Sequence, residues 1–271
     1  MSDVFLNIDE QPKESVSIIS ERLENRSFEG QFADFTKEYF ALLNYDETSK
    51  ILELGGGTGV IGRNFIEFNN FKGKYIVSDL SYELLNYGAT KAKKLQLDDY
   101  LEFKQIDAMS EVIVDEHTYD AVIMHTLVSH VPNPALVIKN AKKFLKKNGK
   151  IIIFDADYET LLMASGNKTL DEIVNTAIKD GCVAQPKVMR EIPKIAKELN
   201  LKLSKCKSNL LFEAGSAEFF YGMGKALSTA VVKSNQLEKK IADKWVNEIE
   251  QAMSKNTFFG MCPYITYIYE V

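Results

Sequence analysis

Three consecutive glycines follow a short apolar run over residues 51–54 and precede a helical pattern that begins near residue 58. From Gly55 to Gly57 the chain carries no Cβ atom, so the backbone can adopt positive φ angles and a ligand can approach the amide groups closely. An acidic side chain, Glu53, lies two residues before the first glycine. The sequence therefore predicts a strand, a glycine-rich turn and a helix that bind a ligand through backbone amides.

An acidic residue also ends the next predicted strand, which covers residues 75–78. Asp79 stands twenty-two residues after Gly57, and a carboxylate in this place can accept hydrogen bonds from ribose hydroxyls. The glycines at positions 57, 59 and 62 also fit the G-x-G-x-x-G fingerprint of dinucleotide-binding proteins. We therefore expect a cofactor that contains adenosine. NAD is one alternative, whereas the 2′-phosphate of NADP would be repelled by Asp79.

Further polar side chains follow the third and fourth predicted strands. Asp107, next to Ala108, ends the strand predicted over residues 101–106, and His125 ends the strand over residues 121–124. Ligands of open α/β sheets bind at the carboxyl ends of the strands, so we expect these residues and the glycine loop to form one site. Dinucleotide folds do not usually have an acid after the third strand, which weighs against NAD.

In their order along the chain, these segments resemble the motifs of the class I S-adenosylmethionine-dependent methyltransferases. The resemblance is strongest to the small-molecule group that includes the ubiquinone/menaquinone-biosynthesis methyltransferases. The segments that carry it are ELGGGTG, VSDLS, QIDAM, YDAVIMHTLVSHVPNP and LKKNGKIIIFD. They cover about residues 48–157, and the ending FFGMCPYITYIYE resembles the last strand of the small-molecule members.

The resemblance implies an S-adenosylmethionine site built by four loops. The residues that match the family's binding positions are Glu53, Gly55, Gly57, Asp79, Leu80, Asp107, Ala108 and His125. The glycine loop would hold the methionine part of the cofactor, with His125 beside it. Asp79 would hold the ribose, and the side chains around Asp107 would hold the adenine. For Glu53, a hydrogen bond to amides of the loop itself is an equally open reading.

Methyl transfer from a sulfonium is an in-line displacement, so the protein mainly positions the two reactants and excludes water. A general base is needed only where the acceptor must lose a proton early. The predicted catalytic residues are His130, Asp157 and Tyr158, because they follow the fourth and fifth strands. His130 would serve as a base or orient the acceptor. The alternative role of His130 is to cap the next helix or pack against it. For Asp157 and Tyr158 the alternative is a hydrogen bond to the backbone.

An acceptor pocket lined by aromatic side chains is a further expectation. Its residues would include Tyr39, Phe40, Met163 and the segment 219–221. Such walls suit an apolar or aromatic small molecule. Aromatic residues at helical spacing are also typical of an ordinary core, so the sequence leaves both interpretations open.

Alternation of strands and helices from residue 50 predicts the α/β fold class. We expect a doubly wound, mainly parallel, seven-stranded sheet that ends in an antiparallel strand pair, with helical cap insertions. The chain would form a single methyltransferase domain over residues 1–271, with the cofactor-binding core at 48–157. Two helices at 12–44, with a break at 24–27, would precede the core, and cap segments at 158–199 and 215–253 would cover the site. Within the core, Ser81 would cap the start of one helix, and another would run from Pro134 to Lys147.

Composition limits the partners of this chain of 271 residues. Its net charge of −5 and pI near 5.4 disfavour a nucleic-acid partner, which needs a clustered basic surface. Three cysteines without C-x-x-C spacing indicate no metal site. The start MSDVFLNIDEQPKES lacks the pattern of a signal peptide and no stretch has the length of a membrane span. A cytoplasmic protein without membrane contact is therefore expected.

Two other functions remain open at this stage. One is an NAD-dependent oxidoreductase, and the other is a non-catalytic protein that binds the cofactor. The identity of the methyl acceptor, the atom methylated and the oligomeric state are not predicted.

Overall fold

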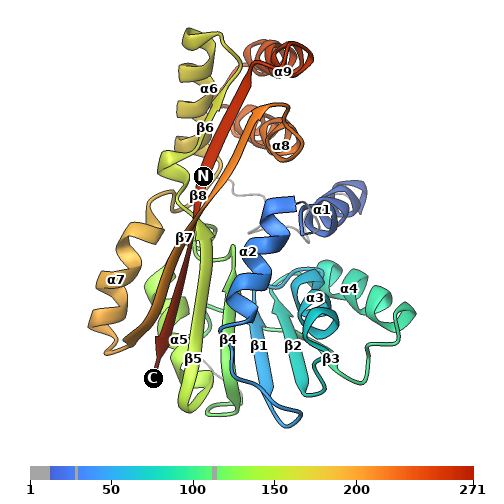
Figure 1. Cartoon of the computed structure of the whole chain (residues 1–271), viewed down its shortest axis with the longest axis vertical. Coiled ribbons are helices and arrows are strands. Elements are labelled where there is room, and N and C mark those ends of the chain that lie inside the picture. Colours follow the sequence, from blue (N-terminus) through green and yellow to red (C-terminus); the bar gives the residue numbers. More distant parts are fainter. Residues whose placement is uncertain (1–12, 28–29, 112–114) are drawn as a thin grey trace.

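A mixed β-sheet with helices on both faces forms the lower half of the molecule in Figure 1. The computed structural model describes residues 13–27, 30–111 and 115–271. The first residue of the predicted segment 12–44 therefore lies outside the described part, as do residues 1–11 of the predicted domain. The predicted break at 24–27 falls later than expected, because the first helix continues to Arg26.

Within the described residues the sheet has eight strands in the order β3-β2-β1-β4-β5-β8-β6, with β7 paired to β8. Strands β1 to β5 are parallel, and β8 runs antiparallel to its neighbours. Their bounds are β1 Lys50–Leu54, β2 Lys74–Asp79, β3 Leu101–Gln105, β4 Tyr119–His125, β5 Leu145–Ala156, β6 Leu162–Ala164, β7 Lys202–Gly215 and β8 Phe258–Glu270. The predicted α/β class and the antiparallel ending are confirmed.

The predicted number of seven strands is wrong by one. The additional strand is β6, which pairs with β8 inside a segment that was expected to be wholly helical. Three residues are too short to show the alternating pattern by which a strand is recognised. The helix predicted to run from Pro134 to Lys147 also ends early, because Leu145 is extended and pairs with Tyr119 of β4.

Helices cover the two faces of the sheet with separate sets of buried side chains. Their bounds are α1 Lys13–Arg26, α2 Gly30–Phe40, α3 Val60–Asn69, α4 Tyr82–Lys94, α5 Pro134–Phe144, α6 Lys168–Gly181, α7 Val188–Glu198, α8 Phe219–Lys233 and α9 Lys239–Ser254. Buried residues of α2, α3 and α4 pack with Ile51 of β1, whereas those of α5 and α7 pack with Leu52 on the opposite face. Both faces of the central strands are thus covered, as in parallel sheets generally.

Local sequence explains where the helices next to the site begin. Ser81 caps α4, since its side chain accepts a hydrogen bond from the amide of Leu84 at 3.2 Å. Asn133 caps α5 in the same way through the amide of Leu136, and Pro134 occupies the first turn. These caps satisfy amide groups that have no partner within the helix. Helix α4 therefore begins at Tyr82, shortly after the end of β2, and α5 begins at Pro134, beyond the turn that follows β4.

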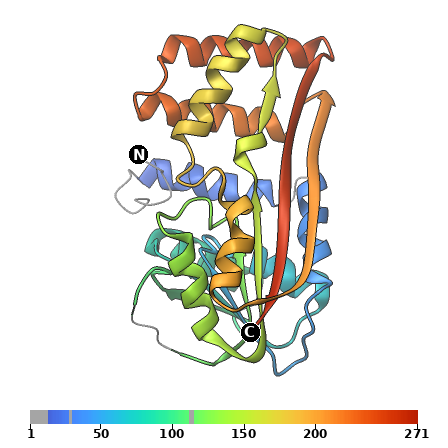
Figure 2. The ribbon, with the colours of Figure 1, turned by 90° about the vertical axis from the view of Figure 1, so that its left-hand side faces the viewer.

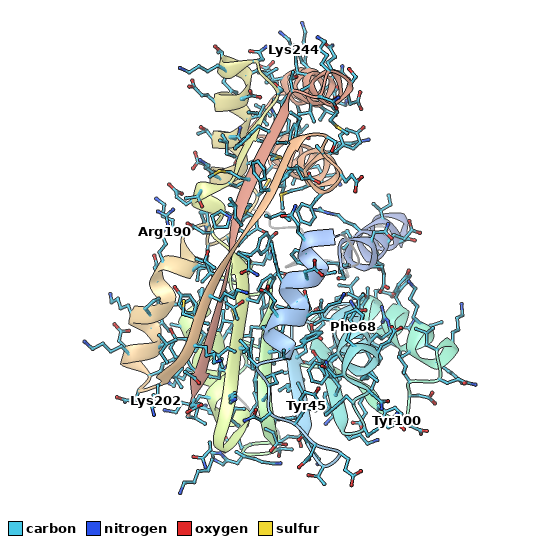
Figure 3. The ribbon with its side chains drawn as sticks, in the orientation of Figure 1. Tyr45, Phe68, Tyr100, Arg190, Lys202 and Lys244 are labelled. Atoms are coloured by element: carbon cyan, nitrogen blue, oxygen red, sulfur yellow. The ribbon has the colours of Figure 1, made fainter. Side chains whose placement is uncertain are left out.

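Helices α6, α8 and α9 gather at the far end of the long β7–β8 ribbon (Figures 1 and 2). Trp245 of α9 is fully buried there and donates a hydrogen bond from Nε1 to Asp171 of α6 at 2.9 Å. Asp171 also accepts hydrogen bonds from the amide and hydroxyl of Ser165. Figure 3 shows the length of this arrangement, with Lys244 at the cap and Lys202 at the opposite end of β7. Among the described helices, none is long and apolar enough to cross a membrane.

Candidate functional site

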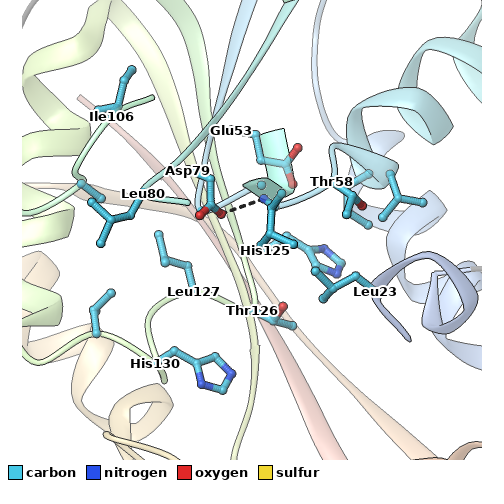
Figure 4. A pocket seen from close by; sticks show the side chains of 18 of the residues that line it. Leu23, Glu53, Thr58, Asp79, Leu80, Ile106, His125, Thr126, Leu127 and His130 are labelled. Carbon is cyan, nitrogen blue, oxygen red and sulfur yellow. Dashed lines mark hydrogen bonds between the residues drawn. The ribbon is translucent and has the colours of Figure 1, made fainter. Parts of the chain in front are cut away.

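A pocket opens at the carboxyl ends of β1 to β4, and Figure 4 shows Asp79 near its centre. It contains all of the predicted cofactor residues and one predicted catalytic residue. These are Glu53, Gly55, Gly57, Asp79, Leu80, Asp107, Ala108, His125 and His130. In Figure 4, His130 lies on the side of the pocket away from Ile106. Residues from four separate loops thus meet at the carboxyl ends of the strands, where the strand order predicted a site.

The glycine loop between β1 and α3 is held in a strained shape that glycine tolerates. Gly55 and Gly57 have φ angles of +68° and +54°, in the left-handed region that other residues rarely adopt. The amide of Gly57 donates a hydrogen bond to Oδ2 of Asp79 at 2.8 Å, and the amide of Gly56 donates to the carbonyl of Ser78 at 2.8 Å. The loop is therefore joined to the end of β2, which carries the predicted ribose-binding carboxylate.

The two carboxylates beside the loop have different surroundings. Asp79 is partly exposed, and its Oδ1 accepts a further hydrogen bond from the amide of Ser81 at 2.9 Å. Glu53 is only 1% exposed, and its Oε2 accepts a hydrogen bond from the hydroxyl of Tyr75 at 3.1 Å. Burial, reinforced by the charge of Asp79, raises the pKa of Glu53 to about 8. A proton thus resides on a side chain that faces the pocket at neutral pH.

The loop after β3 forms one end of the pocket. Oδ1 of Asp107 accepts a hydrogen bond from the amide of Met109 at 2.8 Å, and the Asp107 side chain is otherwise exposed. Nδ2 of Asn140, on α5, donates to the carbonyls of Ala108 and Ser110 at 2.9 Å each. The loop is thus anchored from the neighbouring helix, with Asp107 turned toward the open side.

His125 ends β4 and lies at the inner side of the pocket. It is 4% exposed, and its Nδ1 is 2.8 Å from the hydroxyl of Tyr39 on α2. Phe154 and Phe32 pack against the imidazole with centroid distances of 4.8 and 5.4 Å. The next residue, Thr126, has a φ angle of +53°, an unusual value for a side chain with a branched Cβ. The chain therefore turns sharply as it leaves the strand at the pocket.

The turn that carries His130 is anchored to the end of β5. Buried Asp155 accepts hydrogen bonds from the amide and hydroxyl of Ser129, at 3.0 Å each, and one from the amide of Ala156 at 2.8 Å. Burial raises the pKa of Asp155 above its usual value, although these hydrogen bonds oppose the shift. His130 itself is half-buried and lines the pocket.

The structure separates the other two predicted catalytic residues from this pocket. Asp157 forms an ion pair with Arg190 of α7, with Oδ2 2.9 Å from Nη2, and does not line the pocket. Tyr158 is 5% exposed and its ring lies 6.3 Å from that of His130, so it stands behind the pocket wall. The expected acceptor-pocket residues Tyr39, Phe40, Met163, Phe219 and Phe220 are buried in the core. Core packing, the other interpretation left open by the sequence, is what the structure shows for them.

The chain matches a methyltransferase domain family over residues 45–249, which is most of its length. The chain belongs to the methyltransferase domain family. The match confirms the resemblance drawn from the sequence motifs, together with S-adenosylmethionine as the cofactor of this family. Within the ranges that the structure describes, no group of His, Cys, Asp or Glu side chains is arranged to hold a metal ion.

Relatives of this methyltransferase share only part of its chain. The ubiquinone/menaquinone biosynthesis C-methyltransferase UbiE of Rhizobium rhizogenes is 29% identical over 110 residues, 41% of this chain and 42% of that protein. The phosphatidylethanolamine N-methyltransferase of Cereibacter sphaeroides is 30% identical over 104 residues, 38% of this chain and 49% of that one. The matched part therefore spans less than half the length of these curated relatives.

Solved structures extend the likeness of fold to most of the chain of this methyltransferase. The BH2331 protein of Bacillus halodurans C-125 has a TM-score of 0.62 at 14% identity, over 87% of this chain and 97% of that chain. At this identity the likeness concerns the fold. The likeness of fold covers 87% of this chain, whereas the two curated relatives match 41% and 38% of it.

Sequence reasoning missed the contribution of α1 to the site of this methyltransferase. Leu23 of α1 and Ser27, the residue directly after this helix, line the pocket, and a Cβ atom on Gly57 would come within 3.2 Å of Leu23 Cδ1. Between them, the buried carboxylate of Glu24 forms ion pairs with Arg63 of α3 and Lys91 of α4. Residue 24 was predicted only as part of a break, and its type alone carries no signal for this pairing.

Proposed function

We propose that this methyltransferase binds S-adenosylmethionine in the pocket and transfers its methyl group to a small, uncharged acceptor. When bound, the cofactor supplies an activated methyl group on a sulfonium. The observation that carries the proposal is the meeting of the glycine loop, Asp79 and Asp107 in one pocket. A non-catalytic protein that binds the same cofactor is the competing proposal, and turnover distinguishes the two.

The residues present fit this cofactor. Gly55 and Gly57 have no side chain and have positive φ angles, so the loop can approach the methionyl part closely. Two backbone amides orient the Asp79 carboxylate, which would accept hydrogen bonds from the ribose hydroxyls. Asp107 would accept from the adenine amino group, with Leu80 and Ala108 against the ring. These roles follow from the family resemblance and the placement of the residues.

The charges around the pocket disfavour a negatively charged acceptor. Among the described residues that line it, none is Lys or Arg. A carboxylate or phosphate of the acceptor would lose its hydration there without a cation to replace it. The polar side chains other than carboxylates that lie away from the predicted adenosine contacts are Ser27, Thr126 and His130. The apolar side chains of Leu127 and Val131 lie among them. An apolar molecule with one polar reacting group matches this lining.

His130 is the residue that we assign to the acceptor. It is half-buried, lines the pocket and lies on a turn fixed by Asp155. A histidine at this place can accept a proton or orient a polar reacting group. Asp157 is instead assigned to the ion pair with Arg190, which holds α7 against the end of β5. Tyr158 is assigned to packing behind His130.

Calorimetric titration with S-adenosylmethionine, S-adenosylhomocysteine and NAD tests the cofactor. Binding of the first two without NAD is expected, and binding of NAD alone would replace this proposal with an oxidoreductase. The acceptor is tested by transfer of a labelled methyl group to pairs of small molecules that differ in charge, such as 4-methylphenol and 4-methylbenzoate. Transfer confined to the charged members would contradict the uncharged acceptor. His130→Gln should lower turnover and leave cofactor affinity unchanged.

A further inference from the structure

The hydrogen bond between Tyr39 and His125 joins two elements that are distant in the sequence. The hydroxyl of Tyr39, on α2, lies 2.8 Å from Nδ1 of His125, which is 86 positions further along at the end of β4. The two side chains are 1% and 4% exposed. His125 lines the cofactor pocket, whereas Tyr39 lies behind it in the core. Tyr39 can therefore act on a ligand only through the imidazole ring.

The direction of this hydrogen bond follows from the state of Tyr39. Burial, with a further contribution from the charge of Glu53, raises the pKa of Tyr39 well above its usual value, so the hydroxyl keeps its proton. A buried hydroxyl whose proton has no acceptor is costly. Within the described part of the chain, Nδ1 of His125 is the hydrogen-bond partner of this hydroxyl. Tyr39 therefore donates, and Nδ1 accepts.

An imidazole whose Nδ1 accepts a hydrogen bond carries its hydrogen on Nε2. Phe154 and Phe32 pack against the ring and limit its rotation, with centroid distances of 4.8 and 5.4 Å. A flip of the imidazole would turn Nδ1 away from the Tyr39 hydroxyl, and the turning ring would collide with Phe154 and Phe32. The tautomer and the orientation are therefore set together by α2 and the aromatic side chains around it.

We propose that Tyr39 is a positioning residue, which fixes His125 in the Nε2–H tautomer so that the ring is a hydrogen-bond donor for the cofactor. The inference rests on the proposed function, because it assigns the donor to the methionyl end of S-adenosylmethionine. That end carries a carboxylate, which accepts from an N–H group and is repelled by a bare ring nitrogen. The pocket lining has no Lys or Arg among its described residues, so neutral donors must recognise this carboxylate.

The tautomer can be measured without any substrate. The chain has three histidines, so a long-range ¹⁵N–¹H correlation spectrum resolves each ring, and His117→Gln and His130→Gln variants assign His125 by elimination. A neutral His125 ring with its proton on Nε2 is the expected result for the unmodified protein. A proton on Nδ1, or a ring protonated on both nitrogens at neutral pH, would overturn the inference.

Tyr39→Phe removes the hydroxyl and keeps the ring. We expect the His125 spectrum to lose the pure Nε2–H pattern and the dissociation constant for S-adenosylmethionine to rise about tenfold, as for one lost hydrogen bond. Tyr119→Phe, at the opposite end of β4, is the matched control and should change neither quantity. An unchanged tautomer or an unchanged affinity in Tyr39→Phe would refute the positioning role.

The two measurements separate this inference from the proposed function. If the unmodified protein binds no S-adenosylmethionine, the proposed function fails and the donor role toward the cofactor fails with it. If the protein binds S-adenosylmethionine but His125 has its proton on Nδ1, only the inference about Tyr39 fails.

Discussion

The carboxylate of Asp79 accepts a hydrogen bond from the amide of Gly57, across the gap between the end of β2 and the loop after β1. The bond orients the carboxylate and fixes the shape of the glycine loop at the same time. A charged acceptor makes such a bond stronger than a neutral one would. Loss of the charge should therefore disturb both the predicted ribose contact and the loop.

Asp79→Asn should weaken binding of S-adenosylmethionine by about 10- to 100-fold, the range for hydrogen bonds to a charged group. The amide side chain has one oxygen acceptor in place of two, and its NH₂ group would face the amide of Gly57 or Ser81. Isothermal titration calorimetry measures the change. Asp120→Asn is the matched control, because Asp120 accepts from the amide of Lys50 at the far end of the sheet. Equal affinities of Asp79→Asn and the unmodified protein would refute the ribose assignment.

Glu53 should make folding less stable as pH rises. Its pKa is 4.5 in an ordinary environment and about 8 in the folded protein. Between these values the folded state holds a proton that the unfolded state has released, so raising the pH favours unfolding. Chemical denaturation from pH 5 to pH 8 should show the unmodified protein losing stability relative to Glu53→Gln, which cannot ionise. Parallel pH profiles of the two proteins would contradict the burial of an ionisable carboxyl.

Glu24→Gln should lower the free energy of unfolding by about 3–5 kcal/mol, because it leaves the buried Arg63 guanidinium without its carboxylate. The side chains of Arg63 and Glu24 are only 6% and 7% exposed. Because Leu23 of the same helix and Ser27 directly after it line the pocket, cofactor affinity should fall too. Denaturant titration measures the stability.

The surface pair of Lys104 and Asp115 provides the comparison for Glu24. Its side chains are 40% and 39% exposed, at a separation of 3.0 Å. Asp115→Asn should change stability by less than about 1 kcal/mol, the usual value for an exposed pair. Similar losses of unfolding free energy in Glu24→Gln and Asp115→Asn would show that burial does not increase the contribution of the Glu24 ion pair to stability.

Asp171→Asn should loosen the cap and alter the fluorescence of Trp245, the single tryptophan of the chain. Asp171 accepts from the indole of Trp245 and from the amide and hydroxyl of Ser165. The indole and the Ser165 hydroxyl both donate to Oδ1, whereas the amide of Ser165 donates to Oδ2, where an asparagine would place its NH₂ group. The unsatisfied amide should cost about 1–3 kcal/mol of stability. Asp243→Asn, which changes an exposed side chain on the same helix as Trp245, should leave the emission spectrum as it is.

The features that depend on neighbouring residues could be predicted from the sequence. Asp79 and His125 are the last residues of their strands, and Asp107 stands two residues after the end of β3. Parallel strands end at one edge of the sheet, so the meeting of these residues follows from topology alone. Ser81 was predicted to cap a helix, and it accepts the expected hydrogen bond. Glycines in the loop have the positive φ angles that their lack of a Cβ permits. Here local chemistry determines local structure.

The features that depend on distant pairing could not be predicted. Asp157 and His130 both follow strands, yet Asp157 forms an ion pair with Arg190, thirty-three residues further on. No periodicity in the sequence encodes that choice, or the pairing of Glu24 with Arg63. Tyr39 was expected near the acceptor because it is aromatic, whereas its hydroxyl bonds to His125 from within the core. Which aromatic side chains fill the interior depends on how the whole chain packs.

Strand β8 has a mechanical consequence for how the site admits its ligands. From Phe258 beside the cap helices to Glu270 beside β5, it is paired with β7 along nearly its whole length, and its second half is paired with β5 too. A swing of the cap away from the sheet would have to bend this ribbon or break its ladder of backbone bonds. The cap is therefore expected to keep its position relative to the sheet when ligands enter the pocket.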